Sequence, residues 1–589
     1  MATWVLLEEK ADIEGMGRAL GVSETMAQVL VNRFIDTPKK AAEFLNPTFD
    51  LLHDAALIDN LQAGIDLVVG AVANSEKIAI YGDYDVDGVA STVILYKTLK
   101  NYGADVIYYI PQREEEGYGL NVKAVRALHG LGVDLIFTCD NGISSVNEVE
   151  EAKALGMKVL ILDHHEPPAI LPDADVIIDL KCADSSYPFP LLCAAGLSFR
   201  FAWAFYQHTG AEFANGREFL VFAMIATFCD IVDLRDENRV LAKNGLNVLN
   251  KNKKINKGLY ALLCEKGVQD KPITEFEVGF ILGPCINAAG RLGRADLAVD
   301  LFLSDDDEAV RLAAKELSQL NELRKEMTTE AVDKAKEILL ADYSAQKQLD
   351  SVVVFYDYGI HESIAGIVAG RLKEIFFHPT IVLTKGDLGA KGSGRSIEGY
   401  NMFEELVKCQ HLLERFGGHP MAAGLSLKEE NISLLREELN KNCSLNKDDF
   451  VEKVAYDKIL ALEDATYQLA TELLTLMPFG KGNRPPLFMT SNVCPESIVV
   501  LEEKNTILFN FNTEGSYRKI KGVCFGLVER FAESIAAVFD DYDCQKIMAG
   551  MLRNIPIMMD IVYSLEINEY NGNISVQMKI RDFFVRKGV

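Results

Sequence analysis

The first third of the chain alternates short apolar runs with stretches of amphipathic helical periodicity. The helical patterns occupy residues 88–103, 122–130 and 146–156. The apolar runs are KIAIY (77–81), DVIYYIP (105–111), VDLIFTCD (133–140), KVLILDHH (158–165) and DVIIDLK (175–181). Strands that are almost entirely apolar are typical of a parallel sheet covered by helices on both faces. We therefore predict an α/β fold with a doubly wound parallel sheet.

The rest of the chain carries other patterns. Residues 305–341, including LNELRKEMTTEAVDKAKEILL, keep helical periodicity over many turns, which predicts a long connecting helix. SVVVFYD and TIVLT predict strands of a smaller α/β domain, and the strand-rich segment 487–589, with Asn571-Gly572 as a hairpin turn, fits an OB-fold or another small β-barrel. We expect five parts: an N-terminal helical segment (1–60), a main α/β domain (61–304), the connecting helix (305–345), the smaller α/β domain (346–440) and the C-terminal barrel (449–589).

Composition limits the function classes. The chain has 589 residues and a net charge of -26, which argues against a protein that coats duplex DNA through phosphate contacts. The 11 cysteines include no Cys-x-x-Cys pair, so we expect reduced thiols. The N-terminus does not resemble a signal peptide, and the longest apolar stretch, FLVFAMIATFC (219–229), is shorter than the ~20 residues of a membrane span. We expect a cytoplasmic protein without membrane contact.

Three aspartates, Asp83, Asp85 and Asp87, follow the first apolar run on alternate residues. A solvated acidic turn is one interpretation. A calcium loop of the EF-hand type is another, but the residue at its twelfth position is Ile94 where a bidentate Glu is needed, and a strand precedes the motif. The third interpretation is a catalytic metal site at the end of a strand.

Other strand ends favour the metal site. Asp140 ends one apolar run, and Asp163, His164 and His165 end another, while Asp230 closes an apolar helix pattern. The carboxyl ends of parallel strands meet at one edge of a sheet, where ligands bind. Several acidic strand ends that agree make a solvated turn a poor explanation.

The donor types indicate which metal and which chemistry. Carboxylates with one or two imidazoles suit Mn²⁺ or Mg²⁺ better than a structural zinc ion. Pro167 and Pro168 after the histidines exclude the helix of a zinc protease. The carboxylates exceed the needs of one ion. We therefore predict two ions about 3.5 to 4 Å apart, which activate water for in-line phosphoryl displacement.

Several motifs resemble known families. GDYDVDGVAST, TCDNGISS, LDHHEPP and the segment around Asp230 resemble the four metal motifs of the DHH phosphoesterase superfamily. LGPCINAAGRLGRADLAVDLF (282–302), HESIAGIVAGRLKE, KGSGRS (391–396) and RFGGHPMAAGLSL (415–427) resemble the RecJ family of single-strand-specific 5′→3′ DNA exonucleases. The resemblance implies a parallel-sheet DHH domain, a connecting helix, a smaller α/β DHHA1 domain and a C-terminal OB-fold β-barrel.

The resemblance also implies roles at the metal site. His165 would face the scissile phosphate, and Asp163 would orient a ligand imidazole. Asp140 would bridge the two ions. The ligands of two Mn²⁺ or Mg²⁺ ions would be Asp83, Asp85, Asp87, Asp140, His164 and Asp230.

On the substrate side, the resemblance implies a pocket for a 5′-terminal phosphate. Arg113 and Arg291 would contribute to it beside a loop whose backbone N–H groups cup the anion. That loop would be Gly392, Ser393, Gly394 and Arg395, and Gly417, Gly418 and His419 would lie against the substrate backbone. Relatives usually carry Pro-Arg where this chain has Pro284-Cys285, which puts one phosphate contact in doubt. TFCDIVDL also departs from the usual pattern but keeps Asp230.

Three functions are compatible with these features. The first is an exonuclease that degrades single-stranded DNA from its 5′ end to mononucleotides, in recombination and repair, as a monomer supplied by a helicase and a single-strand-binding protein. The second is a phosphodiesterase for short oligonucleotides or cyclic dinucleotides, against which the strand-rich C-terminal segment argues. The third is a scaffold without activity, against which the complete ligand set argues.

Overall fold

The computed structural model describes residues 2–8, 11–113, 116–346, 349–386, 389–513, 519–570 and 572–588. Its contacts divide the chain into two compact units, and each unit draws on separate parts of the sequence. The larger unit comprises Leu52–Val232 and Leu241–Glu452, and the smaller unit comprises Met1–Leu51, Asp233–Val240 and Lys453–Val589. We describe each unit by itself.

A five-stranded parallel sheet forms the first half of the larger unit. Its strand order is β3-β2-β4-β5-β6, and every neighbouring pair is parallel. The strands are β2 (Ile78–Tyr81), β3 (Val106–Tyr109), β4 (Leu135–Cys139), β5 (Lys158–Leu162) and β6 (Val176–Ile178). The predicted parallel α/β sheet is therefore confirmed.

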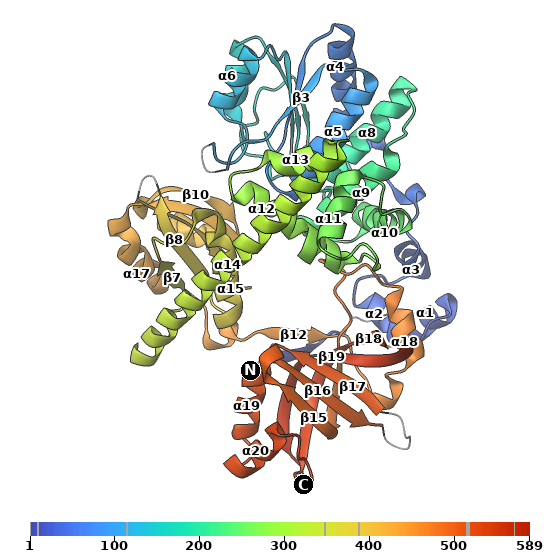
Figure 1. Ribbon diagram of the computed structural model, residues 1–589, viewed down its shortest axis with the longest axis vertical. Coiled ribbons are helices and arrows are strands. Elements are labelled where there is room, and N and C mark those ends of the chain that lie inside the picture. Colours follow the sequence, from blue (N-terminus) through green and yellow to red (C-terminus); the bar gives the residue numbers. More distant parts are fainter. Residues whose placement is uncertain are drawn as a thin grey trace. The chain divides into compact units, whose positions relative to one another are not determined.

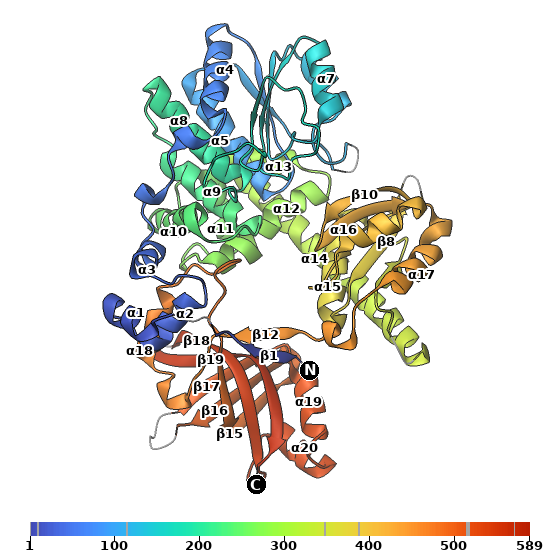
Figure 2. The ribbon, with the colours of Figure 1, turned by 180° about the vertical axis from the view of Figure 1, so that it is seen from behind.

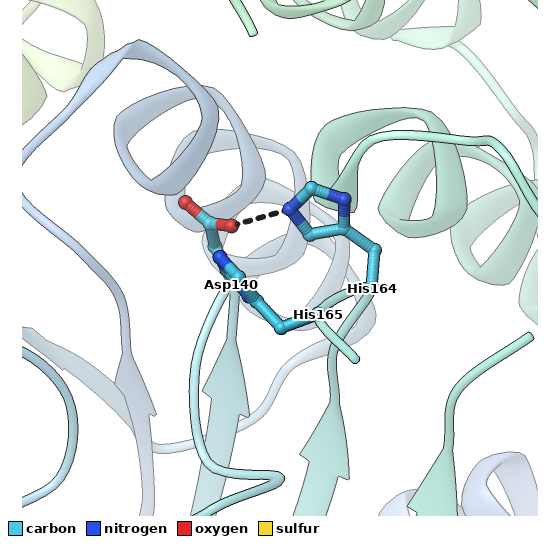
Figure 3. A group of neighbouring side chains, drawn as sticks. All are labelled: Asp140, His164 and His165. Carbon is cyan, nitrogen blue, oxygen red and sulfur yellow. Dashed lines mark hydrogen bonds and ion pairs between the residues drawn. The ribbon is translucent and has the colours of Figure 1, made fainter. Parts of the chain in front are cut away.

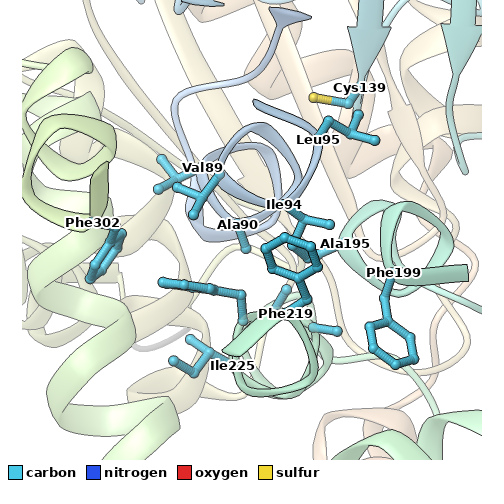
Figure 4. Close-up of a cluster of buried hydrophobic side chains, with 14 of the residues drawn as sticks. Val89, Ala90, Ile94, Leu95, Cys139, Ala195, Phe199, Phe219, Ile225 and Phe302 are labelled. Carbon is cyan, nitrogen blue, oxygen red and sulfur yellow. The ribbon is translucent and has the colours of Figure 1, made fainter. Parts of the chain in front are cut away.

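Helices cover both faces of this sheet, because alternate residues of each strand enter different cores. Ile78 and Ile80 join the core of α5 (Val86–Tyr102), α8 (Ala194–Thr209) and α9 (Gly216–Cys229), whereas Ala79 and Tyr81 join that of α6 (Val122–Gly130) and α7 (Val146–Ala154). Figures 1 and 2 show the two layers on opposite sides of the strands. In Figure 4, Val89, Ala90 and Ile94 lie among side chains that include Phe219, Ile225 and Phe302.

The predicted connecting helix is present as α14 (Asp307–Gln346), which has 40 residues. Its first half contributes Ala314 and Leu317 to the core that also holds residues of α11 (Lys257–Glu265), α12 (Gly283–Arg291) and α13 (Asp296–Leu303). Its second half contributes Ala331 and Ala335 to a separate core with α15 (Ala365–Phe376). One helix thus belongs to the cores of both α/β regions of the larger unit, and Figure 1 shows α14 running from one region to the other.

The second α/β region contains a five-stranded sheet of order β10-β11-β9-β8-β7, in which only β7 and β8 are parallel. Its elements are β7 (Val353–Tyr356), β8 (Thr380–Gly386), β9 (Gly389–Arg395), β10 (Leu413–His419), β11 (Ala422–Leu427), α16 (Met402–Lys408) and α17 (Ile432–Asn442). The prediction of a phosphate-cupping loop at Gly392–Arg395 is wrong. These residues form β9, which pairs with both β8 and β11, so the sheet takes up their backbone N–H groups.

The smaller unit is built on a seven-stranded sheet of order β13-β14-β18-β19-β17-β16-β15. Among the described residues, β13 and β15 end the sheet without pairing to each other, so barrel closure stays a prediction. The predicted hairpin joins β18 and β19, whose Tyr570 and Asn573 are paired, while Asn571 lies outside the described residues. The strands of the seven-stranded sheet are β13 (Lys458–Ile459), β14 (Phe488–Val493), β15 (Pro495–Leu501), β16 (Thr506–Asn512), β17 (Lys519–Phe525), β18 (Ile557–Tyr570) and β19 (Asn573–Lys587).

N-terminal residues belong to this same unit. Strand β1 (Thr3–Leu6) pairs in parallel with β12 (Lys453–Tyr456). Met26 and Leu30 share a core with Leu469 and Leu473. The helices of this unit are α1 (Ile13–Leu20), α2 (Glu24–Val31), α3 (Pro38–Leu45), α18 (Tyr467–Leu474), α19 (Val528–Ala536) and α20 (Asp541–Met548). The N-terminal segment, predicted to be helical, thus also contains a strand.

Two further helices complete the set of α-helices in the described residues. Helix α4 (Leu61–Ala73) precedes β2, and α10 (Asp236–Lys251) follows α9. In the described part of the chain, no single helix is long and apolar enough to cross a membrane. One pair of helical segments, Phe49–Leu57 and Leu61–Ala73, is long and apolar enough when taken together, but the two segments are bent by 74° relative to each other.

Candidate functional site

The residues predicted to bind metal come together at the carboxyl edge of the parallel sheet. Three groups each hold ligand atoms within 4.8 Å of one another. The groups are Asp83, Asp85 and Asp140; Asp140, His164 and His165; and Asp87, His164 and Asp230. Asp140 and His164 are each shared by two groups, so every predicted ligand belongs to one connected cluster.

Asp140 and His164 form the centre of this cluster. The Nε2 atom of His164 lies 3.1 Å from Oδ1 of Asp140 (Figure 3) and 3.5 Å from Oδ2 of Asp87. Its Nδ1 atom lies 3.9 Å from Oδ2 of Asp230. The imidazole therefore has carboxylates near both of its nitrogens.

Local structure explains how the first motif holds its carboxylates. Asp85 is the N-cap of α5 and accepts hydrogen bonds from the backbone N–H groups of Asp87 and Gly88 at 2.8 and 3.2 Å. Asp87 accepts two bonds of 2.7 Å from the first backbone N–H groups of α8, at Ala194 and Ala195. Two helix N-termini thus stabilise negative charge here.

The backbone at Asp140 is strained. Its φ of 63° lies in the left-handed region, which costs a residue with a Cβ atom about 1 to 3 kcal/mol. Its carbonyl accepts a hydrogen bond of 3.0 Å from the hydroxyl of Tyr118. Asp140 adopts this conformation where its carboxylate approaches both Asp83, which follows β2, and His164, which follows β5.

Asp163 contacts a different imidazole from the one that we expected. Its Oδ1 lies 2.7 Å from Nδ1 of His165 and also accepts hydrogen bonds from the backbone N–H groups of His164 and His165, at 2.8 and 3.3 Å. The ring nitrogens of His164 instead face Asp87, Asp140 and Asp230, although the two histidine rings lie close together, with centroids 4.5 Å apart. Asp163 therefore orients His165, and the expectation that it orients the ligand His164 is wrong.

Burial and crowding set the pKa values of the cluster. Burial, and then the charge of neighbouring carboxylates, raises the pKa of Asp83, Asp87 and Asp140 well above the usual range. Oδ1 of Asp83 is buried and accepts no hydrogen bond from the described residues. Bound cations would offset both costs, so the donor set fits divalent metal ions.

The two histidines differ in charge. Burial, and then the charge of His165, lowers the pKa of His164 to about 3, so its ring is neutral, as a metal ligand must be. Burial also opposes the charged form of His165, but the hydrogen bond and charge of Asp163 raise the pKa of His165 to about 9. For Asp163, burial is outweighed by His165, and its pKa is lowered.

Arginines gather beside the cluster. Arg395 donates to Oγ of Ser393 at 2.6 Å, and Arg291 donates to the carbonyl of Ser363 at 2.6 Å. Burial, followed by the charges of Arg113 and Arg324, lowers the pKa of Arg291 to about 10. Burial and then Arg113 lower the pKa of Arg395. Arginines from three parts of the larger unit thus lie close enough for their charges to influence one another's pKa, and we call them the arginine cluster: Arg113, Arg291, Arg324 and Arg395.

Gly417, Gly418 and His419 lie on the edge strand β10, are exposed, and belong to none of the three metal groups. Cys285 is fully buried, and its sulfur lies 3.4 Å from Nδ2 of Asn321 on α14. It faces the core and offers no contact to a phosphate.

Sequence reasoning missed two residues of the site. The Tyr118 hydroxyl lies 3.1 Å from Nε2 of His165, and its ring packs edge-on against Tyr84. Arg324 belongs to the long helix α14 and influences Arg291 by its charge. A tyrosine in the loop after β3 and an arginine on an amphipathic helix carry no pattern that distinguishes them from surface residues.

Comparison with known proteins agrees with this site. The description "DHH family, N-terminal domain" matches residues 77–227, "DHHA1 domain" matches 349–445, and "RecJ OB domain" matches 456–582. The first contains the metal cluster except Asp230, and the second contains the second sheet. The third confirms the predicted OB-fold in the smaller unit.

Relatives resemble nearly the whole chain. The single-stranded-DNA-specific exonuclease RecJ of Bacillus subtilis is 36% identical over 97% of this chain and 69% of its own length. The protein of the same name from Salmonella typhimurium is 31% identical over 90% of each chain. The crystal structure of RecJ with Mn²⁺ from Thermus thermophilus superposes with a TM-score of 0.81 at 26% identity, covering 99% of this chain and 79% of that one. Because the similarity covers most of this chain and most of each of these relatives, the chain belongs to the RecJ family.

Proposed function

We propose that this chain is a metal-dependent exonuclease that degrades single-stranded DNA from the 5′ end and releases 5′-mononucleotides, in recombination and repair. The observation that carries the proposal is the connected cluster of carboxylates and imidazoles, with Asp140 and His164 at its centre, beside four arginines. Relatives named as single-stranded-DNA-specific exonucleases support the substrate.

Two Mn²⁺ or Mg²⁺ ions are the cofactors in this proposal, and RecJ structures from Thermus thermophilus are described with each of these ions. When bound, such ions make a coordinated water acidic and offset the charge of the phosphate. The residues that would hold them are Asp83, Asp85, Asp87, Asp140, His164 and Asp230.

The other polar residues act on the substrate. His165 carries a proton at neutral pH and is held by Asp163, so it donates a hydrogen bond to an oxygen of the scissile phosphate. The Tyr118 hydroxyl, 3.1 Å from Nε2, limits where that imidazole points. Gly417, Gly418 and His419 would lie along the strand backbone.

The arginine cluster sets the direction of attack. A terminal phosphate carries more negative charge than an internal phosphodiester, so a group of guanidinium ions favours it. Ser393 and Arg395 on β9, with Arg113 and Arg291, would bind a 5′ phosphate and leave the next phosphodiester at the metal cluster. Hydrolysis there releases one nucleotide per step.

The wider context belongs to the same proposal. The protein would act as a monomer in the cytoplasm, on strands that a helicase exposes and a single-strand-binding protein covers. The family matches support three of the five predicted domains, at 61–304, 346–440 and 449–589. The boundaries of the segments 1–60 and 305–345 are proposed with them.

Degradation of end-labelled single strands in Mn²⁺ tests the function. We expect label at the 5′ end to be released as mononucleotide at once and label at the 3′ end only late, with Asp140→Ala inactive. Attack from the 3′ end alone, or equal turnover of a dinucleotide and a long strand, would contradict the proposal. The second result would favour a short-oligonucleotide phosphodiesterase.

A further inference from the structure

One continuous helix, residues 275–291, runs through a π-helical segment (Glu277–Leu282) into α12. Val278, Leu282 and Ile286 are buried in the core of the larger unit. On the opposite face, Phe276 and Phe280 are exposed, and the half-buried residues Pro284, Asn287 and Arg291 continue the row. Their spacing of four, four, three and four residues places them in one row along the helix.

The C-terminal end of this row reaches the functional site. Oδ1 of Asn287 accepts a hydrogen bond of 3.0 Å from the backbone N–H of Val86, which lies between Asp85 and Asp87. Arg291 is a member of the arginine cluster. The row therefore ends where a 5′ phosphate would bind.

The N-terminal end of the row is aromatic. Phe276 and Phe280 are 56% and 71% exposed, and their rings stack with centroids 5.2 Å apart and an interplanar angle of 24°. The exposed face of an amphipathic helix normally carries polar side chains. Two stacked rings in solvent leave apolar surface in water without any gain in folding.

The buried face of the same helix packs against the segment that leads to a metal-cluster residue. The carbonyl of Val278, between the two rings in sequence, lies 3.9 Å from the sulfur of Cys229, and Cys229 directly precedes Asp230. The same helix thus packs beside the residue that precedes Asp230 and carries a guanidinium group of the arginine cluster at its C-terminal end.

We infer that Phe276 and Phe280 form a base-stacking platform for the single strand whose 5′ end occupies the arginine cluster. The inference rests on the proposed function and deepens it by assigning a subsite. Aromatic faces accept every base, which suits an exonuclease that must pass any sequence. A helical rise of about 1.5 Å per residue puts Phe280 about 16 Å from Arg291. That length equals about five nucleotides at duplex spacing and fewer in an extended strand.

Kinetics with long and short substrates test the platform. We expect Phe276→Ala and Phe280→Ala each to raise KM for a long single strand by about fivefold to 150-fold, because one base–aromatic stack is lost. Their kcat, and their turnover of a dinucleotide that cannot reach the rings, should stay unchanged. Phe280→Tyr keeps a flat aromatic ring, so its KM for the long strand should stay close to that of the wild type. Leu131→Ala removes an equally exposed apolar side chain, 59% exposed after α6, and should behave as the wild type.

An abasic site moved stepwise along the strand locates the contact. In the wild type, KM should rise only when the missing base falls a few nucleotides from the 5′ end, and the double alanine variant should lose this dependence. An unchanged KM for the long strand in both single variants would overturn the platform, as would an equal loss with the dinucleotide. Failure of the proposed function itself looks different, because the wild type would then not release 5′ label first.

Discussion

The two sheets of the larger unit both contribute residues to the proposed site, but in different ways. In the parallel sheet, Asp83, Asp140 and His164 follow the strands, and the strands themselves are apolar. In the second sheet, Ser393 and Arg395 are members of the strand β9. Polar residues at strand ends stand out because they interrupt an apolar run. In a glycine-rich strand such as β9, the glycines and polar residues take the place of the apolar run itself. The first kind of site is therefore visible in a sequence and the second resembles a turn.

The largest effect should come from the strand ends. Asp140→Gly should lower kcat by at least about a thousandfold, or about 4 kcal/mol, because it removes a carboxylate shared by two groups of ligands. In EDTA the same variant should be more stable than the wild type by about 1 kcal/mol or more, because glycine adopts a φ of 63° without strain. Initial rates and thermal unfolding measure the two effects. A variant that keeps its activity would remove Asp140 from the metal site.

The strand β9 should matter for binding rather than for the chemical step. Arg395→Ala should raise KM for a 5′-phosphorylated strand by about tenfold to 150-fold, since hydrogen bonds to charged groups contribute about 1.5 to 3 kcal/mol. A strand with a 5′ hydroxyl serves as the control substrate and should show little change. Equal losses with both substrates would mean that Arg395 does not bind the terminal phosphate.

The strand assignment of the Gly-Ser-Gly motif can be tested by stability. A Cβ atom at Gly392 would lie 2.0 Å from the carbonyl oxygen of Val382 on β8, so Gly392→Ala should destabilise the protein by about 1 to 3 kcal/mol. Gly417, with nothing within 4 Å of such an atom, should tolerate the same change. Denaturant unfolding compares the two variants. Equal stability would favour a phosphate-cupping loop over the strand.

The pair of His165 and Asp163 should give a smaller, pH-dependent effect in the metal-free protein. The pKa of His165 is raised from 6.5 to about 9, so its stabilising charge is fully present below pH 6.5 and is lost as pH rises through 9. The stability of the wild type in EDTA should therefore fall more steeply over this range than that of His165→Gln, in which the raised pKa values of Asp83, Asp87 and Asp140 still contribute. Urea unfolding at several pH values checks this, and parallel curves for the two proteins would contradict the pairing.

The sequence predicted the parts of the molecule that depend on local patterns. Asp83, Asp140 and the three residues at 163–165 could be placed together because each follows an apolar run in a parallel sheet. The long helix α14 followed from its periodicity. These features need only the geometry of strands and helices.

Other features depend on packing that no local pattern records. Which of two adjacent imidazoles Asp163 holds is decided by how the backbone turns after β5, and we expected the wrong one. The pairing of β1 with β12 joins residues from opposite ends of the chain. Tyr118 and Arg324 reach the site only through the loops and helices that carry them. Such residues become visible when the fold is known.

Calorimetric titration of the metal-free protein with Mn²⁺ tests the central claim most directly. The shared positions of Asp140 and His164 predict two ions per chain in the wild type, with binding of both weakened in Asp140→Ala. Absence of Mn²⁺ binding, or binding that Asp140→Ala leaves intact, would contradict a metal centre at the edge of the parallel sheet.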